Sequence, residues 1–327
     1  MLAFILRRLA QSIIVMLVVA LISFMLFRFV GDPVANLVGQ EARLSDIEQL
    51  REDLGLNDPF YMQFARFIAN AVQGEFGISY RLQTPVNQLI ASRLPATIEL
   101  AFASATIALV FGLVLGVFAA LKPKSPATAG IMTLSLVGVS LPTFLIGIGL
   151  LYLFAVELRW LPSFGRGDVV DLGWWRTGLL TGSGLRSLIL PAITLSLFQL
   201  TLIMRLVRAE MLEVLRADYI RFARARGLSS RAINFGHALK NTMVPVITIT
   251  GLQLGSVIAF AIVTETVFQW PGVGSLFINS VQVADVPVMA AYLMFIAFVF
   301  VVINLIVDVL YYAVDPRLRV NAPGAGK

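Results

Sequence analysis

Cysteine is absent from this chain, histidine occurs once, and charged residues are scarce. Without cysteine the chain can form no disulfide and offers no thiolate to a metal or a substrate. With His237 as the only histidine, the sequence holds no HExxH motif and no Cys/His cluster, which argues against a histidine-based metal or nucleophilic site. Charged residues make up 13% of the 327 residues and hydrophobic residues 58%, whereas an ordinary soluble domain carries about 25% charged residues. The composition therefore indicates an integral membrane protein.

A phosphate-binding loop for ATP is also missing. That motif needs GxxxxGK followed by Ser or Thr, with a helix behind it. The one Gly-Lys pair, Gly326-Lys327, has neither a hydroxyl residue nor a helix after it. We therefore expect that this chain is not an enzyme and that it binds no ATP, metal or other cofactor itself.

Six apolar runs, by contrast, are each long enough to cross about 30 Å of hydrocarbon. They predict an all-α integral membrane protein with six transmembrane helices, at about Leu9–Phe27, Leu100–Leu121, Gly130–Val156, Ser187–Leu206, Pro245–Thr266 and Val288–Tyr312. Pro142 and Pro191 predict kinks in the third and fourth helices. Arg7 and Arg8 before the first run also resemble the start of a cleaved signal peptide. The run is longer than the usual ~7–15 residues, so residues 1–30 are expected to stay as a membrane helix.

Residues 31–96 form a polar block between the first two predicted helices, and residues 97–320 hold the other five helices before a tail at 321–327. Ser45 and Glu48 have the spacing of a capping box. Thr84–Ser92 predicts a short helix that ends before Pro95. The block is too long for a simple turn, so we expect a large loop that folds on the extracytoplasmic surface. A passive linker and a platform for a soluble partner both remain possible.

Lys and Arg gather on one side of the predicted helices. Arg7, Arg8, Lys122, Lys124 and the segment 205–240 carry the surplus of positive charge, while the connections on the other side together are slightly acidic. Because the side rich in Lys and Arg is cytoplasmic, both termini are expected there. The net charge of +6 thus has a topological cause and requires no nucleic-acid partner.

The longest basic segment between the apolar runs is Arg205–Pro245. Its apolar residues recur at three- and four-residue steps, which predicts one helical stripe of Leu212, Leu215, Tyr219, Phe222 and Ala223. Gly227 suits a left-handed helix end, Ser229 the cap of a second helix, and Pro245 the first turn of the next apolar helix. Two interpretations are open: an ordinary basic loop, or a knuckle of helix, turn and helix that docks on a partner and passes force to the membrane helices.

One known family has a segment like this one. Residues 218–246, DYIRFARARGLSSRAINFGHALKNTMVPV, resemble the EAA-type loop of permease subunits of ATP-binding-cassette importers, and most closely the dipeptide, oligopeptide and nickel branch. Further motifs of the first (B-type) permease of that branch follow in order along nearly the whole chain: GDP (31–33), LGLNDPF (54–60), GEFGIS (74–79), RLPATIEL (93–100), ETVFQWPGVG (265–274) and NLIVDVLYYAVDPRLR (304–319). The general pattern has Glu-Ala-Ala before the glycine, where this chain has Arg221, Phe222 and Ala223.

The resemblance implies a type I importer permease fold in the bacterial inner membrane. It also implies four kinds of partner: a second homologous permease subunit, two cytoplasmic ATP-binding subunits that use ATP and magnesium, an extracytoplasmic substrate-binding protein, and a peptide substrate. A nickel chelate and glutathione are alternative substrates, and no substrate-contacting residue is identifiable. The residues implied to couple ATP hydrolysis to transport are Asp218, Tyr219, Arg221, Phe222, Ala223, Arg224, Ala225, Gly227, Leu228 and His237. From its residue type and position alone, His237 is interpreted as a polar packing residue.

Three acidic residues, Glu99, Glu265 and Asp308, lie near the ends of predicted spans. Charges near the middle of the membrane would favour an ion-coupled secondary transporter, whereas these positions favour an interfacial role. No internal repeat supports that second function class. A membrane enzyme or scaffold is a third possibility, for which the sequence offers no convergent Ser/His/Asp arrangement.

Two glycine pairs at a spacing of four, Gly112 with Gly116 and Gly251 with Gly255, predict close approach of helix backbones. The contact lies either within the chain or against a second membrane subunit.

Overall fold

The computed structural model describes residues 2–29, 48, 52 and 57–314, and most of these are helical. The elements in order are α1 (Leu2–Phe29), α4 (Phe60–Val72), α5 (Val86–Leu121), α6 (Pro126–Ser140), α7 (Thr143–Leu151), the π-helix η1 (Tyr152–Glu157), β1 (Val170–Asp171), β2 (Arg176–Thr177), α8 (Gly182–Val214), α9 (Asp218–Ala225), the π-helix η2 (Ala232–Ala238), α10 (Leu239–Val267), α11 (Val273–Gln282) and α12 (Val286–Val314). The predicted capping box from Ser45 and the tail at 321–327 lie outside the described residues.

Four helices, α1, α5, α8 and α12, are long and apolar enough to cross a membrane by themselves. Two bent pairs pass the same test together: α6 with the α7–η1 helix, and Ala232–Gly251 with Gly255–Val267. The six predicted spans are therefore recovered in position if each bent pair counts as one span.

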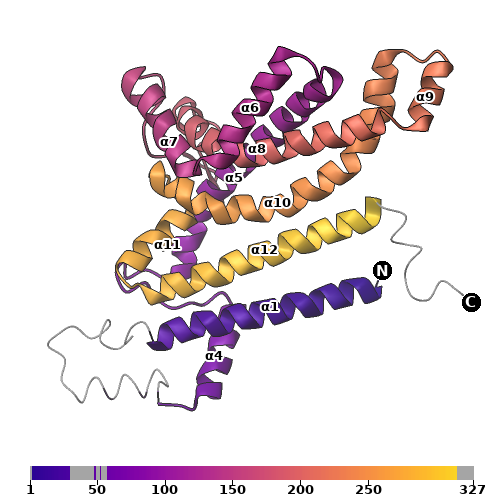
Figure 1. Ribbon diagram of the computed structural model, residues 1–327. Coiled ribbons are helices and arrows are strands. Elements are labelled where there is room, and N and C mark those ends of the chain that lie inside the picture. The colour runs from indigo at the N-terminus through magenta and orange to yellow at the C-terminus, as the bar shows by residue number, and fades with distance from the viewer. Residues whose placement is uncertain (1, 30–47, 49–51, 53–56, 315–327) are drawn as a thin grey trace, which may run out of the picture.

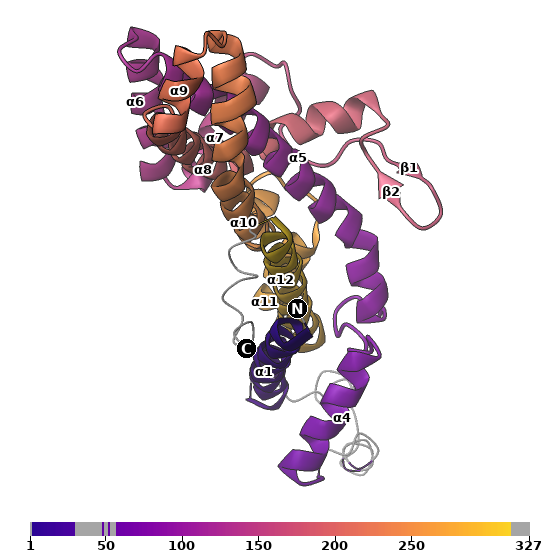
Figure 2. The same cartoon turned by 90° about the vertical axis from the view of Figure 1, so that its right-hand side faces the viewer.

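The long helices run roughly alongside one another, with α10 between α8 and α12, and α1 antiparallel to α12 (Figure 1). The start of α1 and the end of α12 lie at the same end of the molecule as α9, while α11 lies at the opposite end. Figure 2 shows the two-stranded β1–β2 hairpin projecting to one side of the helices. The short helix α4 packs on α1, where the ring of Phe24 lies 5.3 Å from that of Phe60.

Glycines allow close helix contacts within the chain. A Cβ placed on Gly116 would lie 2.7 Å from the side chain of Val207. The backbone of α5 at Gly116 therefore packs directly against the Val207 side chain of α8. At the other pair, a Cβ on Gly251 would lie 2.8 Å from Val307 of α12. Both pairs thus serve packing inside this chain, as small residues do in membrane bundles.

The prediction of a short helix that ends before Pro95 is wrong, because α5 is continuous from Val86 to Leu121 with Pro95 inside it. An internal proline removes one hydrogen bond, to the carbonyl four residues earlier. Here that carbonyl belongs to Ala91, which is exposed, so the helix continues at small cost.

The prediction of one helix over residues 130–156 is also wrong. The chain bends by 111° between α6 and α7. Leu141, the residue before Pro142, has φ −89° and ψ 139°, which is the extended conformation that a following proline favours. Pro142 therefore breaks this span rather than kinking it.

Candidate functional site

The segment between α8 and α10 lies at the end of the molecule that also holds the chain's described termini (Figure 1). Helix α8 ends at Val214, and a turn closes with the Ala217 N–H donating to the Val214 carbonyl at 3.0 Å. Ala217 is extended, with φ −65° and ψ 149°, and α9 begins at Asp218. The prediction of one continuous helix through this stripe is therefore wrong, although Leu212, Leu215 and Ala223 pack against the same buried cluster.

Gly227 ends α9 as predicted. Its φ is +78°, a left-handed conformation that costs other residues energy. Its N–H donates to the Arg224 carbonyl at 2.9 Å, and the Leu228 N–H donates to the Ala223 carbonyl at 3.3 Å. Those two bonds are the Schellman pattern, so glycine is required here by the backbone and not by crowding.

Ser229 then caps the next helix as predicted, with its Oγ accepting the Ala232 N–H at 3.3 Å. This helix passes through η2 directly into α10. Pro245 consequently lies inside α10 and not in the first turn of a separate helix, which corrects that prediction.

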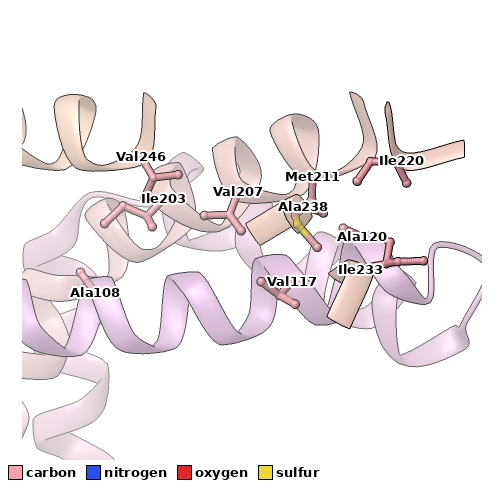
Figure 3. Close-up of a cluster of buried hydrophobic side chains, with 10 residues drawn as sticks. All are labelled: Ala108, Val117, Ala120, Ile203, Val207, Met211, Ile220, Ile233, Ala238 and Val246. Carbon is pink, nitrogen blue, oxygen red and sulfur yellow. The ribbon is translucent and has the colours of Figure 1, made fainter. Parts of the chain in front are cut away.

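A buried apolar cluster anchors the segment to the membrane helices (Figure 3). Ile220 of α9 and Ile233 of η2 are fully buried, and they belong to one cluster with Met211 of α8 and Val117 of α5. Burying each isoleucine contributes about 1.5–3 kcal/mol. The segment is therefore packed firmly against α5, α8 and α10.

Polar contacts add to this anchoring. The Asn241 amide donates to the Tyr219 hydroxyl at 2.9 Å, which ties α9 to the start of α10. Arg221 pairs with Asp218 at 3.2 Å, one helical turn away. Both members of this ion pair are largely exposed, so it adds little to stability.

Four side chains of this segment face outward and define what we name the tip surface: Phe222, Arg224, Arg226 and Leu228. Phe222 is 65% exposed and Leu228 43%, and the Arg226 guanidinium lies over the Phe222 ring at 5.9 Å. Exposed apolar side chains, one of them beside a cation, suit contact with a complementary protein surface.

Three further residues that were predicted to couple ATP hydrolysis differ in their exposure. Ala223 is half-buried against the apolar cluster, whereas Ala225 is exposed. His237 is exposed on η2, so its interpretation as a packing residue is wrong.

The sequence analysis missed the anchors Ile220, Ile233 and Ala238. Ile220 and Ile233 are the two isoleucines between Asp218 and Ala238, and their β-branched apolar side chains among many charged residues were the available signal. The pairing of Tyr219 with Asn241, which are 22 residues apart, left no local signal.

Two predicted span-end carboxylates are buried at the other end of the fold. Glu99 of α5 accepts from Arg166 at 2.6 Å and from the Trp175 indole at 3.2 Å. Glu265 of α10 accepts from the Thr97 hydroxyl at 2.6 Å and from the Ser275 N–H at 2.8 Å. Each carboxylate therefore holds a connecting segment against α5.

The third predicted carboxylate, Asp308, lies on α12. The structure describes its backbone but not its side chain. Within the described residues, no group of three or more His, Cys, Asp or Glu side chains is placed to hold a metal ion.

A bundle of apolar helices with an anchored polar segment at one end and a carboxylate-tied connection at the other is the architecture of a membrane transport subunit. Residues 112–320 match the model of the family described as binding-protein-dependent transport system inner membrane component. Residues 1–101 match the N-terminal membrane component of the same systems. The chain belongs to this family, and it is an importer permease of the peptide branch.

Similar proteins agree with that membership. The chain is 41% identical, over 98% of its length and 99% of the relative, to a putative peptide transport system permease protein of Brucella abortus (strain 2308). It is 41% identical over the same shares to the di/tripeptide transport system permease protein DppB of Pseudomonas aeruginosa (strain UCBPP-PA14). It is 38% identical, over 98% and 99%, to the glutathione transport system permease protein GsiC of Shigella flexneri serotype 5b (strain 8401).

Among solved structures, an inward-facing MetNI methionine ABC transporter shares the fold. The TM-score is 0.55 over 70% of this chain and 97% of that chain, with 16% identity. This confirms the predicted type I importer permease fold and, at that identity, nothing finer.

Proposed function

We propose that this permease carries small peptides across the inner membrane and is driven by separate ATP-hydrolysing subunits that dock on the tip surface. The observation that carries the coupling role is the pairing of an exposed apolar tip, Phe222 and Leu228, with the buried anchors beneath it. A surface that docks without firm anchoring would absorb the partner's motion, whereas this one passes it to α5, α8 and α10.

The partners follow from the family, whose description names binding-protein-dependent transport. We propose two ATP-binding subunits that use ATP and magnesium on the cytoplasmic side, a second permease subunit beside this one, and a binding protein at the opposite face. The surplus of Lys and Arg around the tip surface supports a cytoplasmic location for it and for both termini.

Peptides are the proposed substrate because two of the relatives above carry the words peptide or di/tripeptide in their names. Glutathione, itself a peptide, is a second candidate on the strength of the third relative. A nickel chelate is a third candidate substrate, and no feature of the described residues supports it.

The test of coupling replaces Phe222 by alanine in the complete transporter. Removal of an aromatic anchor from an interface typically costs about 2 kcal/mol or more, so ATP-driven uptake of a dipeptide should fall by about tenfold or more. Phe102→Ala is the matched control, because Phe102 is 70% exposed but lies on α5 within a candidate membrane span. It should leave uptake unchanged.

Normal uptake by Phe222→Ala with normal recovery of the ATPase subunits would refute the coupling role. Uptake by the purified chain alone, driven by an ion gradient, would favour the secondary transporter instead.

A further inference from the structure

Residues of α5, α11 and the adjoining connections line a polar groove. Helix α11 lies at the end of the molecule remote from α9 (Figure 1). The groove consists of two neighbouring cavities of about 390 Å³ each, which share Arg93 and Asn279 as lining residues. Each volume falls within the range of small-molecule sites, about 300–1,000 Å³. A solute that approaches from the side opposite the tip surface meets this groove.

The two carboxylates that line the groove are already satisfied by donors of the chain. Both oxygens of Glu265 accept hydrogen bonds, as described above. Asp285 is fully buried, and it accepts from the Ser79 hydroxyl and from the Tyr80 N–H, the latter at 3.1 Å. Neither carboxylate needs a ligand.

The two arginines that line the groove are not satisfied in this way. Within the part of the chain that is described, Arg93 and Arg81 take part in no hydrogen bond and no salt bridge, although the charge of Arg93 acts on the Glu265 carboxylate of the same groove. Arg93 is half-buried on α5 and lines both cavities, whereas Arg81 is exposed and lines one. A half-buried guanidinium whose five N–H groups bond no group of the described chain can donate to an anion. A carboxylate matches its planar fork with two parallel hydrogen bonds.

We propose that Arg93 binds the terminal carboxylate of the peptide during its entry into the permease, with Arg81 attracting it from the rim. This rests on the proposed import of peptides, which carry a terminal carboxylate at neutral pH. Gln269, Asn279 and Ser275 line the same groove and offer neutral polar groups to the peptide's amide bonds. The concave site and the half-buried position of Arg93 suit a small solute better than the side chain of a docking protein, which would contact the exposed Arg81 first.

The test uses the complete transporter in proteoliposomes, with its ATPases, second permease subunit and binding protein. Initial uptake rates of dialanine and of its C-terminal amide are compared at equal fractional occupancy of the binding protein. Loss of a charge-assisted hydrogen-bonded pair typically weakens binding by about 10- to 100-fold. Arg93→Gln should therefore lower uptake of the free acid by about tenfold and leave uptake of the amide nearly unchanged.

Three controls make the result decisive. Arg93→Lys keeps the charge but loses the planar fork, so its acid uptake should lie between that of Arg93→Gln and that of the unaltered complex. Arg176→Gln removes an arginine that pairs with Asp171 away from the groove, and it should change neither peptide's uptake. Stimulation of ATP hydrolysis by the binding protein should be the same in Arg93→Gln as in the unaltered complex.

Equal loss of acid and amide uptake, or loss of the stimulated ATP hydrolysis, would mean that Arg93 serves docking or stability, and would overturn the inference. Unchanged acid uptake by Arg93→Gln would also overturn it. If the unaltered complex imported neither peptide with ATP, the proposed function itself would fail.

Discussion

Thr97 of α5 and Glu265 of α10 are joined by a hydrogen bond of 2.6 Å between two buried side chains. The same Thr97 oxygen accepts the N–H of Val273 at 2.9 Å. One hydroxyl therefore fixes α5, α10 and the start of α11 relative to one another. Since α11 forms a wall of the polar groove, this side chain helps to set the shape of the groove, together with the Ser275 N–H bond to Glu265.

Thr97→Val should destabilise the protein by about 2–4 kcal/mol, because the change leaves a carboxylate oxygen and a buried N–H without partners. Valine has nearly the shape of threonine, so lost packing does not explain the effect. Thr97→Ser keeps the hydroxyl and should lose far less stability than Thr97→Val. Thermal unfolding in detergent measures both, and equal melting temperatures for Thr97→Val and the parent would disprove the claim.

Gly227→Ala should strain the turn after α9, because a left-handed conformation costs an L-residue about 1–2 kcal/mol. A Cβ on Gly227 would meet nothing within 4 Å, so no clash contributes.

Gly236→Ala is its matched control, since Gly236 lies in the η2 helix with equally open surroundings. Alanine there should be neutral or stabilise the helix by about 0.5–1 kcal/mol. Proteolysis of the segment and ATP-driven uptake are the measurements. Opposite shifts in the two variants are expected, and identical ones would contradict the conformational explanation.

Gly116→Ala should separate α5 from α8. Its Cβ would lie 2.7 Å from Val207 and 2.8 Å from the Met204 carbonyl, and a backbone atom cannot move aside as a side chain can. Overpacking of this kind costs about 1–3 kcal/mol. Gly130→Ala in α6 meets nothing within 4 Å and should be harmless. A melting temperature of Gly116→Ala at or above that of Gly130→Ala would show that the two helices are not packed this closely.

Glu99→Gln should destabilise the protein by about 3–5 kcal/mol, because it leaves the buried positive charge of Arg166 without a negative partner. The double variant Glu99→Gln/Arg166→Met removes both charges and should recover a large part of that loss. Asp171→Asn breaks the exposed pair with Arg176 and should change stability by less than about 1 kcal/mol. Unfolding measures the stability of each variant and of Arg166→Met alone. If the double variant lost as much stability as the two single variants together, the two charges would not act on each other.

Much of the tip segment was predictable from the sequence because its signals are local. The left-handed turn at Gly227 and the serine cap at Ser229 depend on atoms within five residues. The break between α8 and α9 was not predicted, because the apolar spacing continues through it. After the break, Ile220 lies buried in one cluster with Met211 and Val117, which are contacts between separate helices that local spacing does not reveal.

The sequence alone determined that the chain is a membrane protein, where its apolar segments lie, and which family it resembles, because composition and contiguous motifs carry that information. Only the tertiary structure decided whether Pro95 and Pro142 continue or break their helices, since that depends on where the freed backbone groups lie. It also decided the partners of Glu99 and Glu265, because Arg166 and Thr97 reach them across 67 and 168 residues of sequence. Hydrogen bonds form between groups that are close in space, and separation along the chain does not predict that distance.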